Sequence, residues 1–276
     1  LLIGVTAVWG LTFVVVKNAL NSISPFYFNA LRFTIATLFL LIVCYLNKQS
    51  FSRQIIKKGL LVGLFLFGGY SFQTIGLRYT TASNAGFITG LSVVIVPFLM
   101  FALYKERPSV YASLSIILAA LGLSLLSLDE NFALNSGDLL ILLCALCFAL
   151  HMILVGHFTS RFETIPFVTV QIATVALASW VAGLLGEPFP PHLSGQVWLG
   201  LLITAIPATS LAYLIQNWAQ RFTTPTHTAL ILAIEPVFSM LFAFLLLEEF
   251  FTKQDLLGAI LMLIGMLLAE IKSPNS

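Results

Sequence analysis

Apolar residues dominate the chain in ten long segments, and short polar stretches separate them. The segments lie near residues 1–17, 25–46, 58–77, 82–103, 109–127, 138–157, 165–186, 196–218, 225–247 and 254–271. An α-helix needs about 20 residues to cross some 30 Å of hydrocarbon, and most of these segments have that length. The pattern therefore predicts an all-α integral membrane protein with ten transmembrane helices.

Composition supports the same conclusion. The chain has 276 residues, of which 59% are hydrophobic and 9% charged, whereas soluble domains carry about 25% charged residues. The lipid bilayer is therefore an expected partner. A net charge of +2 gives no basic surface for nucleic acid, so none is expected. Leu1 already lies inside an apolar run, and we expect the natural start to lie upstream.

Lysine and arginine are distributed unevenly between the two sets of alternate loops. The richer set, with the C-terminal tail, holds Lys48, Arg53, Lys57, Lys58, Lys105, Arg107, Arg161, Arg221 and Lys272. The opposite set holds Lys17, Arg78 and Lys253. Cytoplasmic loops carry the excess of positive charge. The expectation is a multi-pass protein of the cell membrane, with the bacterial inner membrane as the expected site and both termini cytoplasmic.

The chain also contains a weak internal repeat. A shift of 143 residues pairs Arg78 with Arg221, Thr80 and Thr81 with Thr223 and Thr224, Glu106 with Glu249, and Gly122 with Gly265. A shift of 139 pairs Trp9 with Phe148, Gly10 with Ala149, Arg32 with Gln171, and Pro97 with Pro236. This predicts a first five-helix repeat over residues 1–130 and a second over 131–276.

Five helices is an odd number, so the second repeat must enter the membrane from the opposite side. Inverted repeats are typical of transporters, whose binding sites lie near mid-membrane where the repeats meet. Some channels also have them. The repeat therefore favours transport in general without selecting a mechanism.

Several stretches together resemble the drug/metabolite transporter superfamily, specifically its tandem EamA-type domains. They are AVWGLTFVVVK at 7–17, LRF at 31–33, GLRYTTASNAGFI at 76–88, KERPS at 105–109, GDLLILLCALCFAL at 137–150 and IEPVFSMLFAFLLLEE at 234–249. The resemblance implies a ten-helix fold, a central cavity, and proton- or exchange-linked movement of small metabolites. The sequence departs from the common pattern at Lys105, where glycine is frequent, and at His151, where an aromatic residue often stands.

Glu235 is an ionisable residue about eleven positions into the ninth segment, which is roughly mid-bilayer at 1.5 Å per residue. A charge at that depth is costly and indicates function. Pro236 follows and can locally open the helix beside a cavity. Glu235 is therefore a candidate proton carrier, and the alternative is a neutral or ion-paired glutamate that holds helices together.

Arg32 lies about seven residues into the second segment and has three alternative roles. It could pair with Glu235, bind a carboxylate or phosphate of the substrate, or extend to the membrane interface.

The other candidates are mainly amide, histidine and aromatic side chains, which could serve structure as well as function. Amides within the segments serve either as interhelical hydrogen bonds or as substrate ligands, and His151 and His227 could titrate near neutral pH. Tyr70 and Phe13 could add to an aromatic wall. The predicted substrate-binding residues are Trp9, Thr12, Arg32, Gln73, Asn84, Phe87, His151, Gln171, Tyr213 and Gln216, and the predicted proton-coupling residues are Glu235 and His227.

The function that these observations favour is secondary transport of a small organic metabolite or drug-like molecule, more specifically its export, with protons as a candidate coupling ion. No nucleotide-binding or hydrolase motif is visible, so neither ATP-driven transport nor an enzyme is expected, and no cofactor is predicted. The alternatives are a non-transporting sensor or scaffold, and an exchanger of nucleotide sugars or phosphorylated sugars with the same fold.

Overall fold

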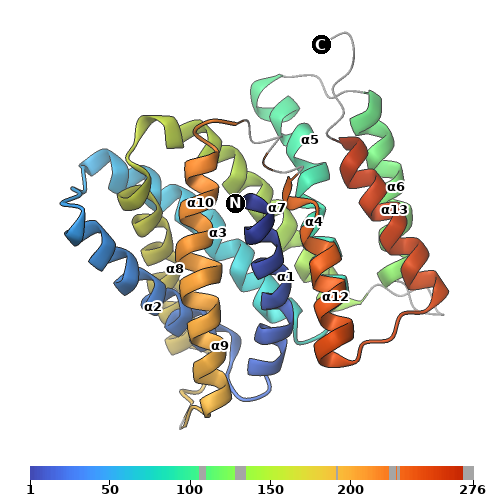
Figure 1. Ribbon diagram of the computed structural model, residues 1–276, viewed down its shortest axis with the longest axis horizontal. Helices are drawn as coiled ribbons and strands as arrows, with labels where there is room; N and C mark the ends of the chain where they lie inside the picture. The colour runs from blue at the N-terminus through green and yellow to red at the C-terminus, as the bar shows by residue number, and fades with distance from the viewer. Residues whose placement is uncertain (106–109, 128–134, 191, 224–227, 229–230, 270–276) are drawn as a thin grey trace.

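A computed structural model describes residues 1–105, 110–127, 135–190, 192–223, 228 and 231–269, and within these ranges the secondary structure is entirely helical (Figure 1). The helices form ten membrane-crossing segments: α1 (Leu2–Ala19), α2 (Pro25–Leu46), α3 (Arg53–Gly76), α4 (Ala82–Gly90) with α5 (Ser92–Tyr104), α6 (Val110–Ser127), α7 (Ser136–Phe158), α8 (Thr164–Gly186), α9 (Gly195–Ala205) with the π-helix η2 (Ile206–Leu211) and α10 (Ala212–Ala219), α12 (Glu235–Leu247) and α13 (Lys253–Ala269). A short 3₁₀ turn, η1 (Thr159–Arg161), follows α7. Seven of these segments are long and apolar enough to cross a membrane by length and composition. The ten-helix membrane fold is therefore confirmed.

Side-chain caps set several helix starts. Oγ of Ser52 accepts a hydrogen bond from the backbone N–H of Ile55 at 3.2 Å, and Oγ1 of Thr81 accepts one from Asn84 at 3.1 Å. Such caps satisfy N–H groups that have no partner inside the helix. The Ser52 cap explains why α3 begins at Arg53, five residues before the predicted apolar segment.

The helix contacts follow a twofold pattern in which each segment exchanges with the one five places later. Three contacts map onto themselves under this exchange: α2 with α8, α4 with α12, and α6 with α13. The other major contacts form matching pairs. Contact of α3 with α7 matches α1 with α9, contact of α4 with α7 matches α1 with α12, and contact of α3 with α8 matches α2 with α9.

The two halves run in opposite directions, as hydrogen bonds at Thr80 show. Nζ of Lys17, near the C-terminal end of α1, donates to the Thr80 carbonyl oxygen. The Thr80 hydroxyl donates to Asp138, in the first turn of α7. Because α1 and α7 are the corresponding first helices of the halves, opposite ends of equivalent helices meet at one side of the molecule. The repeats are inverted.

Two glycines allow α4 to lie directly against α12. A Cβ atom at Gly90 would lie 2.7 Å from Cγ of Pro236, and one at Gly86 would overlap the Ser239 side chain. Ser239 also donates a hydrogen bond of 2.9 Å to the Ala82 carbonyl oxygen. These small residues therefore let the two helices pack closely, as small residues commonly do at helix interfaces in membranes.

Three segments that the apolar pattern predicts as single runs are interrupted in the structure. Leu91 separates α4 from α5, a turn at Ala233 and Ile234 precedes α12, and η2 separates α9 from α10. Pro207 lies in the first turn of η2 and lacks the N–H needed for a regular α-helix. Two hydroxyls add hydrogen bonds to carbonyls five residues back in the chain, since Thr209 donates to the Thr204 carbonyl and Ser210 to that of Ala205.

Candidate functional site

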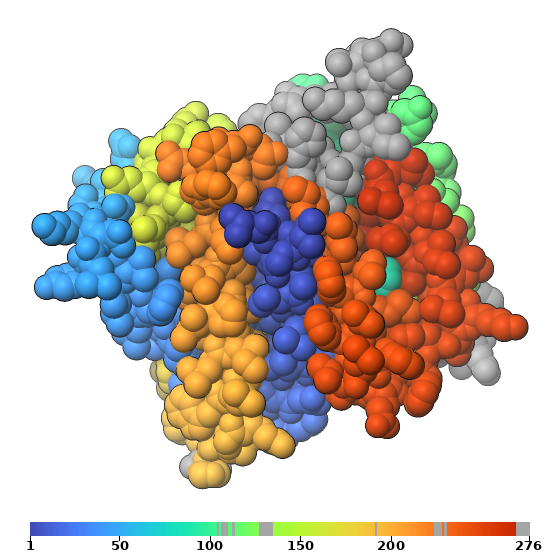
Figure 2. All heavy atoms as spheres, in the orientation of Figure 1, coloured from blue at the N-terminus to red at the C-terminus, as the bar shows by residue number. Residues whose placement is uncertain are grey.

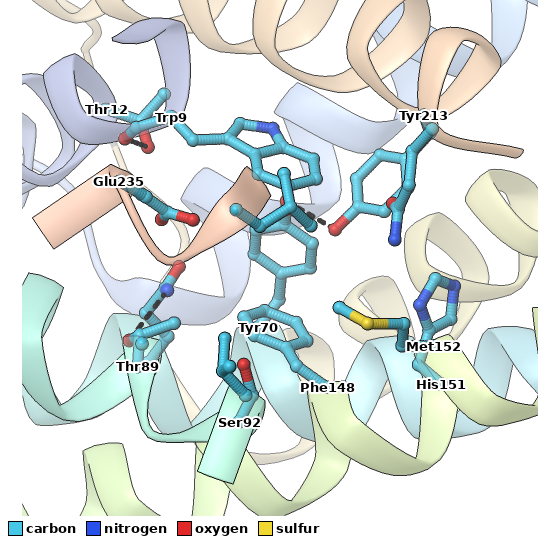
Figure 3. Close-up of a pocket in the computed structure, with 15 residues that line it drawn as sticks. Trp9, Thr12, Tyr70, Thr89, Ser92, Phe148, His151, Met152, Tyr213 and Glu235 are labelled. Atoms are coloured by element: carbon cyan, nitrogen blue, oxygen red, sulfur yellow. Dashed lines mark hydrogen bonds between the residues drawn. The ribbon is translucent and has the colours of Figure 1, made fainter. Parts of the chain in front are cut away.

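A cavity of about 50 Å³ lies between the two halves, at the interrupted segments. It is lined from both repeats, by Trp9, Thr12, Tyr70, Gln73, Thr89, Gly90, Ser92, Val93, Phe148, His151, Met152, Tyr213, Gln216, Leu232 and Glu235 (Figure 3). Seven of the twelve predicted site residues belong to this lining. They are Trp9, Thr12, Gln73, His151, Tyr213, Gln216 and Glu235.

Glu235 occupies the helix break of the ninth segment. It is the first residue of α12, after Ile234 at φ −82° and ψ −16°, and Pro236 follows it. Its side chain is half-buried and faces the cavity (Figure 3). Among the described residues, its carboxyl group has no hydrogen-bond or ion-pair partner. The pairing with Arg32 considered from the sequence is therefore absent from the structure.

The first repeat has a matching break on the opposite wall. Leu91, at φ −61° and ψ −14°, ends α4 and precedes α5. The shift of 143 residues places Leu91 on Ile234 and Ser92 on Glu235. Both Ser92 and Glu235 line the cavity. The two repeats thus open the equivalent helix at the same position, and this relation is the sequence signal that could have found Ser92.

Aromatic rings form the centre of the lining, between Glu235 and His151 in Figure 3. The Trp9 and Tyr213 ring centroids are 5.4 Å apart, and those of Tyr70 and Phe148 are 5.3 Å apart. The Tyr213 hydroxyl donates to the Tyr70 hydroxyl at 3.0 Å. Nε1 of Trp9 donates at 2.8 Å to the carbonyl oxygen of Ala208 in η2. The π-helix thereby fixes the indole against the cavity, as π-helical turns often do at functional sites.

Phe148 was not among the predicted site residues, although the repeat pairs it with Trp9. The two rings lie on opposite walls of the same cavity, from α1 and α7 (Figure 3).

Arg32 lies behind this wall instead of in it. Its side chain is 1% exposed, so it does not extend to the membrane interface. Nε donates to the Thr209 hydroxyl at 2.9 Å and Nη2 to the Tyr70 hydroxyl at 3.4 Å. The guanidinium carbon lies 4.7 Å from the Tyr70 ring centroid, within range of a cation–π contact. Arg32 therefore contacts the cavity through Tyr70.

Gln171, the repeat partner of Arg32, has a similar place on the other wall. It is completely buried, and its Oε1 accepts a hydrogen bond of 3.0 Å from Nε2 of His151. Its Nε2 donates to Oδ1 of Asn217 at 3.2 Å, and Asn217 donates to the Tyr213 carbonyl at 3.0 Å. Because a carbonyl oxygen can only accept, the bond places a proton on Nε2 of His151.

Two further predicted residues, Asn84 and Phe87, lie outside the lining. Nδ2 of Asn84 donates to the Leu126 carbonyl at 3.0 Å and joins α4 to α6. Phe87 is 3% exposed and packs in the apolar core. His227 lies outside the described residues. Substrate binding or proton coupling by these residues stays a prediction.

Two amides of the lining have unused hydrogen-bonding capacity. Gln216 is 2% exposed, and its Oε1 has no hydrogen-bond partner within the described ranges. Nε2 of Gln73 makes a long bond of 3.5 Å to the Thr89 hydroxyl. A buried acceptor without a partner costs about 1–3 kcal/mol, so Gln216 is suited to bind a donor group in the cavity.

Hydrogen bonds join the two halves at one end of the molecule. The end cluster consists of Lys17, Thr80, Ser83, Asp138 and Glu249. Glu249, beyond the C-terminus of α12, accepts from the backbone N–H groups of Ala82 at 3.0 Å and Ser83 at 3.3 Å, and from the Ser83 hydroxyl at 2.8 Å. A carboxylate at a helix N-terminus is stabilising. Together with the bonds of Thr80 to Lys17 and Asp138, this cluster joins α1, α4, α7 and α12.

Inverted repeats, interrupted helices and a cavity between the halves are typical of membrane transporters. The chain matches the EamA-like transporter family twice, over residues 1–128 and 135–270. It belongs to this family, and it is a multi-pass membrane protein.

Known relatives carry the same general description. The chain is 38% identical to an uncharacterized transporter of Archaeoglobus fulgidus, over 97% of this chain and 84% of that protein. It is 23% identical to the uncharacterized transporter YoaV of Bacillus subtilis, over 96% and 93% of the two chains. A solved structure titled "Crystal structure of protein" superposes with a TM-score of 0.72 at 21% identity, over 97% of this chain and 95% of that one. This likeness shows the fold alone.

Proposed function

We propose that the chain is a secondary transporter that exports a small organic molecule by alternating access, with a proton carried by Glu235. The substrate binds between a first repeat, residues 1–130, and a second, residues 131–276. The observation that supports this most directly is the carboxyl group of Glu235, which faces the inter-repeat cavity with no partner among the described residues.

The cavity is small compared with known ligand sites, which supports a binding site that must enlarge to admit substrate. A water molecule needs about 10–15 Å³ of such space, so 50 Å³ holds a few waters. Sites for drug-sized ligands measure about 300–1,000 Å³. The two halves must therefore move apart to admit substrate. The matching breaks at Leu91 and Ile234 are suited to this, because the helix halves on either side can tilt separately.

Proton carriage follows from the setting of Glu235. A charged residue at the bilayer centre costs about 2.5–3.5 kcal/mol on insertion scales, and no cation among the described residues pairs with this one. A structural glutamate would be expected to hold a neighbouring helix. A carboxyl group that faces the cavity instead can exchange a proton with water or with the substrate.

The orientation that we propose follows the distribution of lysine and arginine, with both termini in the cytoplasm. The end cluster then lies on the outer side, and the structure corresponds to a state closed to that side. The bacterial inner membrane is the proposed location.

Transport and coupling can be tested separately in liposomes. A ligand is first found by thermal stabilisation against amino acids, nucleobases, phosphorylated sugars and cationic drugs, since a ligand of the folded state raises its melting temperature. The wild-type protein should concentrate that ligand when a pH gradient is imposed. The Glu235→Gln variant should let it equilibrate without concentrating it.

The matched control is Glu163→Gln, which changes an exposed carboxyl group at the start of α8 and should leave uphill transport unchanged. Uphill transport by Glu235→Gln would show that proton carriage by Glu235 is wrong. Ligand binding by the wild type without any flux would refute the transport proposal itself.

A further inference from the structure

A second and larger cavity lies on the surface between α1 and α9, apart from the inter-repeat cavity. It has a volume of about 470 Å³. Figure 2 shows α1 on this face, flanked by α9 on one side and α12 on the other. We call this cavity the α1–α9 groove. It shares no lining residue with the inter-repeat cavity.

One end of the groove is polar but carries no charge. The side chains of Asn18, Asn21, Ser22 and Gln196 line it and are exposed. None of them makes a hydrogen bond to another described residue. No lysine, arginine, aspartate or glutamate belongs to the described lining. Lys17 is the neighbour of Asn18, but its ammonium donates to the carbonyl of Thr80 in the end cluster.

The other end of the groove is apolar. Val15, Leu199 and Ile203 continue the lining along both helices, and Ile203 lies about 10 Å beyond Gln196 along α9 at 1.5 Å per residue. Leu199 is 60% exposed. Trp198 lies beside the polar end and is 46% exposed, and tryptophan is enriched at the level of lipid headgroups. The groove is thus polar at the level of the lipid headgroups and apolar at the level of the acyl chains, as the bilayer is.

We propose that the α1–α9 groove binds a lipid with a neutral, hydroxyl-rich headgroup, of the glycosyl diacylglycerol kind. The headgroup lies among the amides of Asn18, Asn21 and Gln196, and an acyl chain lies along Leu199 and Ile203.

Amide side chains both donate and accept hydrogen bonds, and so do the neighbouring hydroxyls of a sugar. An anionic phospholipid would need lysine or arginine in the groove, and a zwitterionic headgroup would need charges of both signs. The described lining offers neither. The apolar half of the groove favours a lipid over a free sugar, because a lipid has an acyl chain to pack against Val15, Leu199 and Ile203 and a free sugar has none.

The test is native mass spectrometry of the purified protein in mild detergent, with monoglucosyl diacylglycerol, phosphatidylglycerol and phosphatidylethanolamine added at equal concentrations. The wild type should retain one glucolipid in a saturable manner and neither phospholipid. Replacing all three amides, as Asn18→Ala, Asn21→Ala and Gln196→Ala together, should weaken glucolipid retention by roughly tenfold or more, because the headgroup loses its hydrogen-bond partners.

Two further variants complete the design. Gln54→Ala removes an exposed amide near the start of α3, at the opposite end of the molecule, and should leave retention unchanged. Leu199→Asn should weaken binding of the glucolipid, because it places a polar side chain in the apolar half of the groove. Thermal melting shows that each variant is folded.

Three results would overturn the proposal. They are equal retention of either phospholipid, full glucolipid retention by the triple variant, and binding of methyl glucoside as tightly as the glucolipid. The last would identify a soluble sugar as the occupant.

Discussion

Arg32 and Gln171 lie one side chain away from the cavity, and each holds a residue of its lining. Arg32 donates to the Tyr70 hydroxyl, and Gln171 accepts from His151. The repeat pairs these two residues with each other. Equivalent positions in the two halves therefore support the cavity wall from behind, with a cation on one side and an amide on the other. We infer that both are positioning residues for the rings that the substrate meets.

The Gln171→Leu variant tests this support. It leaves the polar groups of His151 and Asn217 without their partner in a completely buried place. Interhelical hydrogen bonds in membranes average about 0.6 kcal/mol, and a buried group left unpaired costs more, so we expect a loss of about 1–3 kcal/mol. The measurement is thermal unfolding in detergent. Gln54→Leu, at an exposed amide, should change stability by less than about 0.5 kcal/mol. Equal melting temperatures for the two variants would show that the hydrogen bonds of Gln171 do not stabilise the cavity wall.

Sequence reasoning placed both residues within apolar segments but could not choose the face of the helix. Their depth follows from the apolar segments around them. In a helix that is apolar almost all round, the period of polar positions does not tell which side faces the cavity. Arg32 was therefore a candidate for direct binding, whereas the structure places Tyr70 between its guanidinium and the cavity.

The elements that shape the site are interrupted helices, and the fourth and ninth segments depend on very close contact. Gly90 lies just before the break at Leu91, against Pro236 just after the break at Ile234. The two breaks thus touch each other. A side chain at this contact would separate the half-helices that form opposite walls of the cavity.

Replacing Gly90 by alanine should therefore destabilise the protein. The added Cβ would lie 2.7 Å from Cγ of Pro236 and 2.8 Å from Cε of Met266, and overpacking of this kind costs about 1–3 kcal/mol. Gly4 is the control, because a Cβ there would meet nothing within 4 Å. Gly4→Ala should be neutral or stabilising by up to about 1 kcal/mol, since alanine favours helix. Thermal unfolding of the two variants should move in opposite directions, and a stabilised Gly90→Ala would contradict the close contact.

The breaks were only partly predictable. Pro236 signalled a disturbance in the ninth segment, and the structure has one there. The fourth segment has no proline at its break, and Pro97 lies six residues further on, inside α5. The structure shows its interruption at Leu91, the residue that the shift of 143 places on Ile234. The π-helix had Pro207 as its signal, but its form depends on hydroxyl bonds from Thr209 and Ser210 that no periodic pattern predicts.

At the scale of the whole molecule, the end cluster joins the two halves on one side of the cavity. Glu249 caps α4, and α4 leads directly to Thr89 and Gly90 in the lining. Glu187 makes a similar cap on α2, accepting from Phe26 at 2.9 Å and Tyr27 at 3.3 Å. The two carboxylates make comparable bonds, but α2 contributes no residue to the lining.

Because α4 lines the cavity and α2 does not, loss of the Glu249 cap should affect access to the cavity and loss of the Glu187 cap should not. In a cysteine-free protein with Ser92→Cys as a reporter in the cavity, Glu249→Ala should increase the rate of labelling by a water-soluble thiol reagent. The loss of its cap releases α4 from α12 at the joined end. Glu187→Ala loses a comparable cap, worth about 0.5–2 kcal/mol, and should leave labelling unchanged. Equal acceleration by both variants would indicate general loosening instead of opening at this end.

The central claim is that one site between inverted halves opens to each side of the membrane in turn. Its most direct test labels Ser92→Cys with a membrane-impermeant thiol reagent in sealed right-side-out and inside-out vesicles. We predict labelling from both sides, with Glu249→Ala accelerating it from the side of the end cluster and slowing it from the other. Labelling from one side only, whatever the variant, would contradict alternating access.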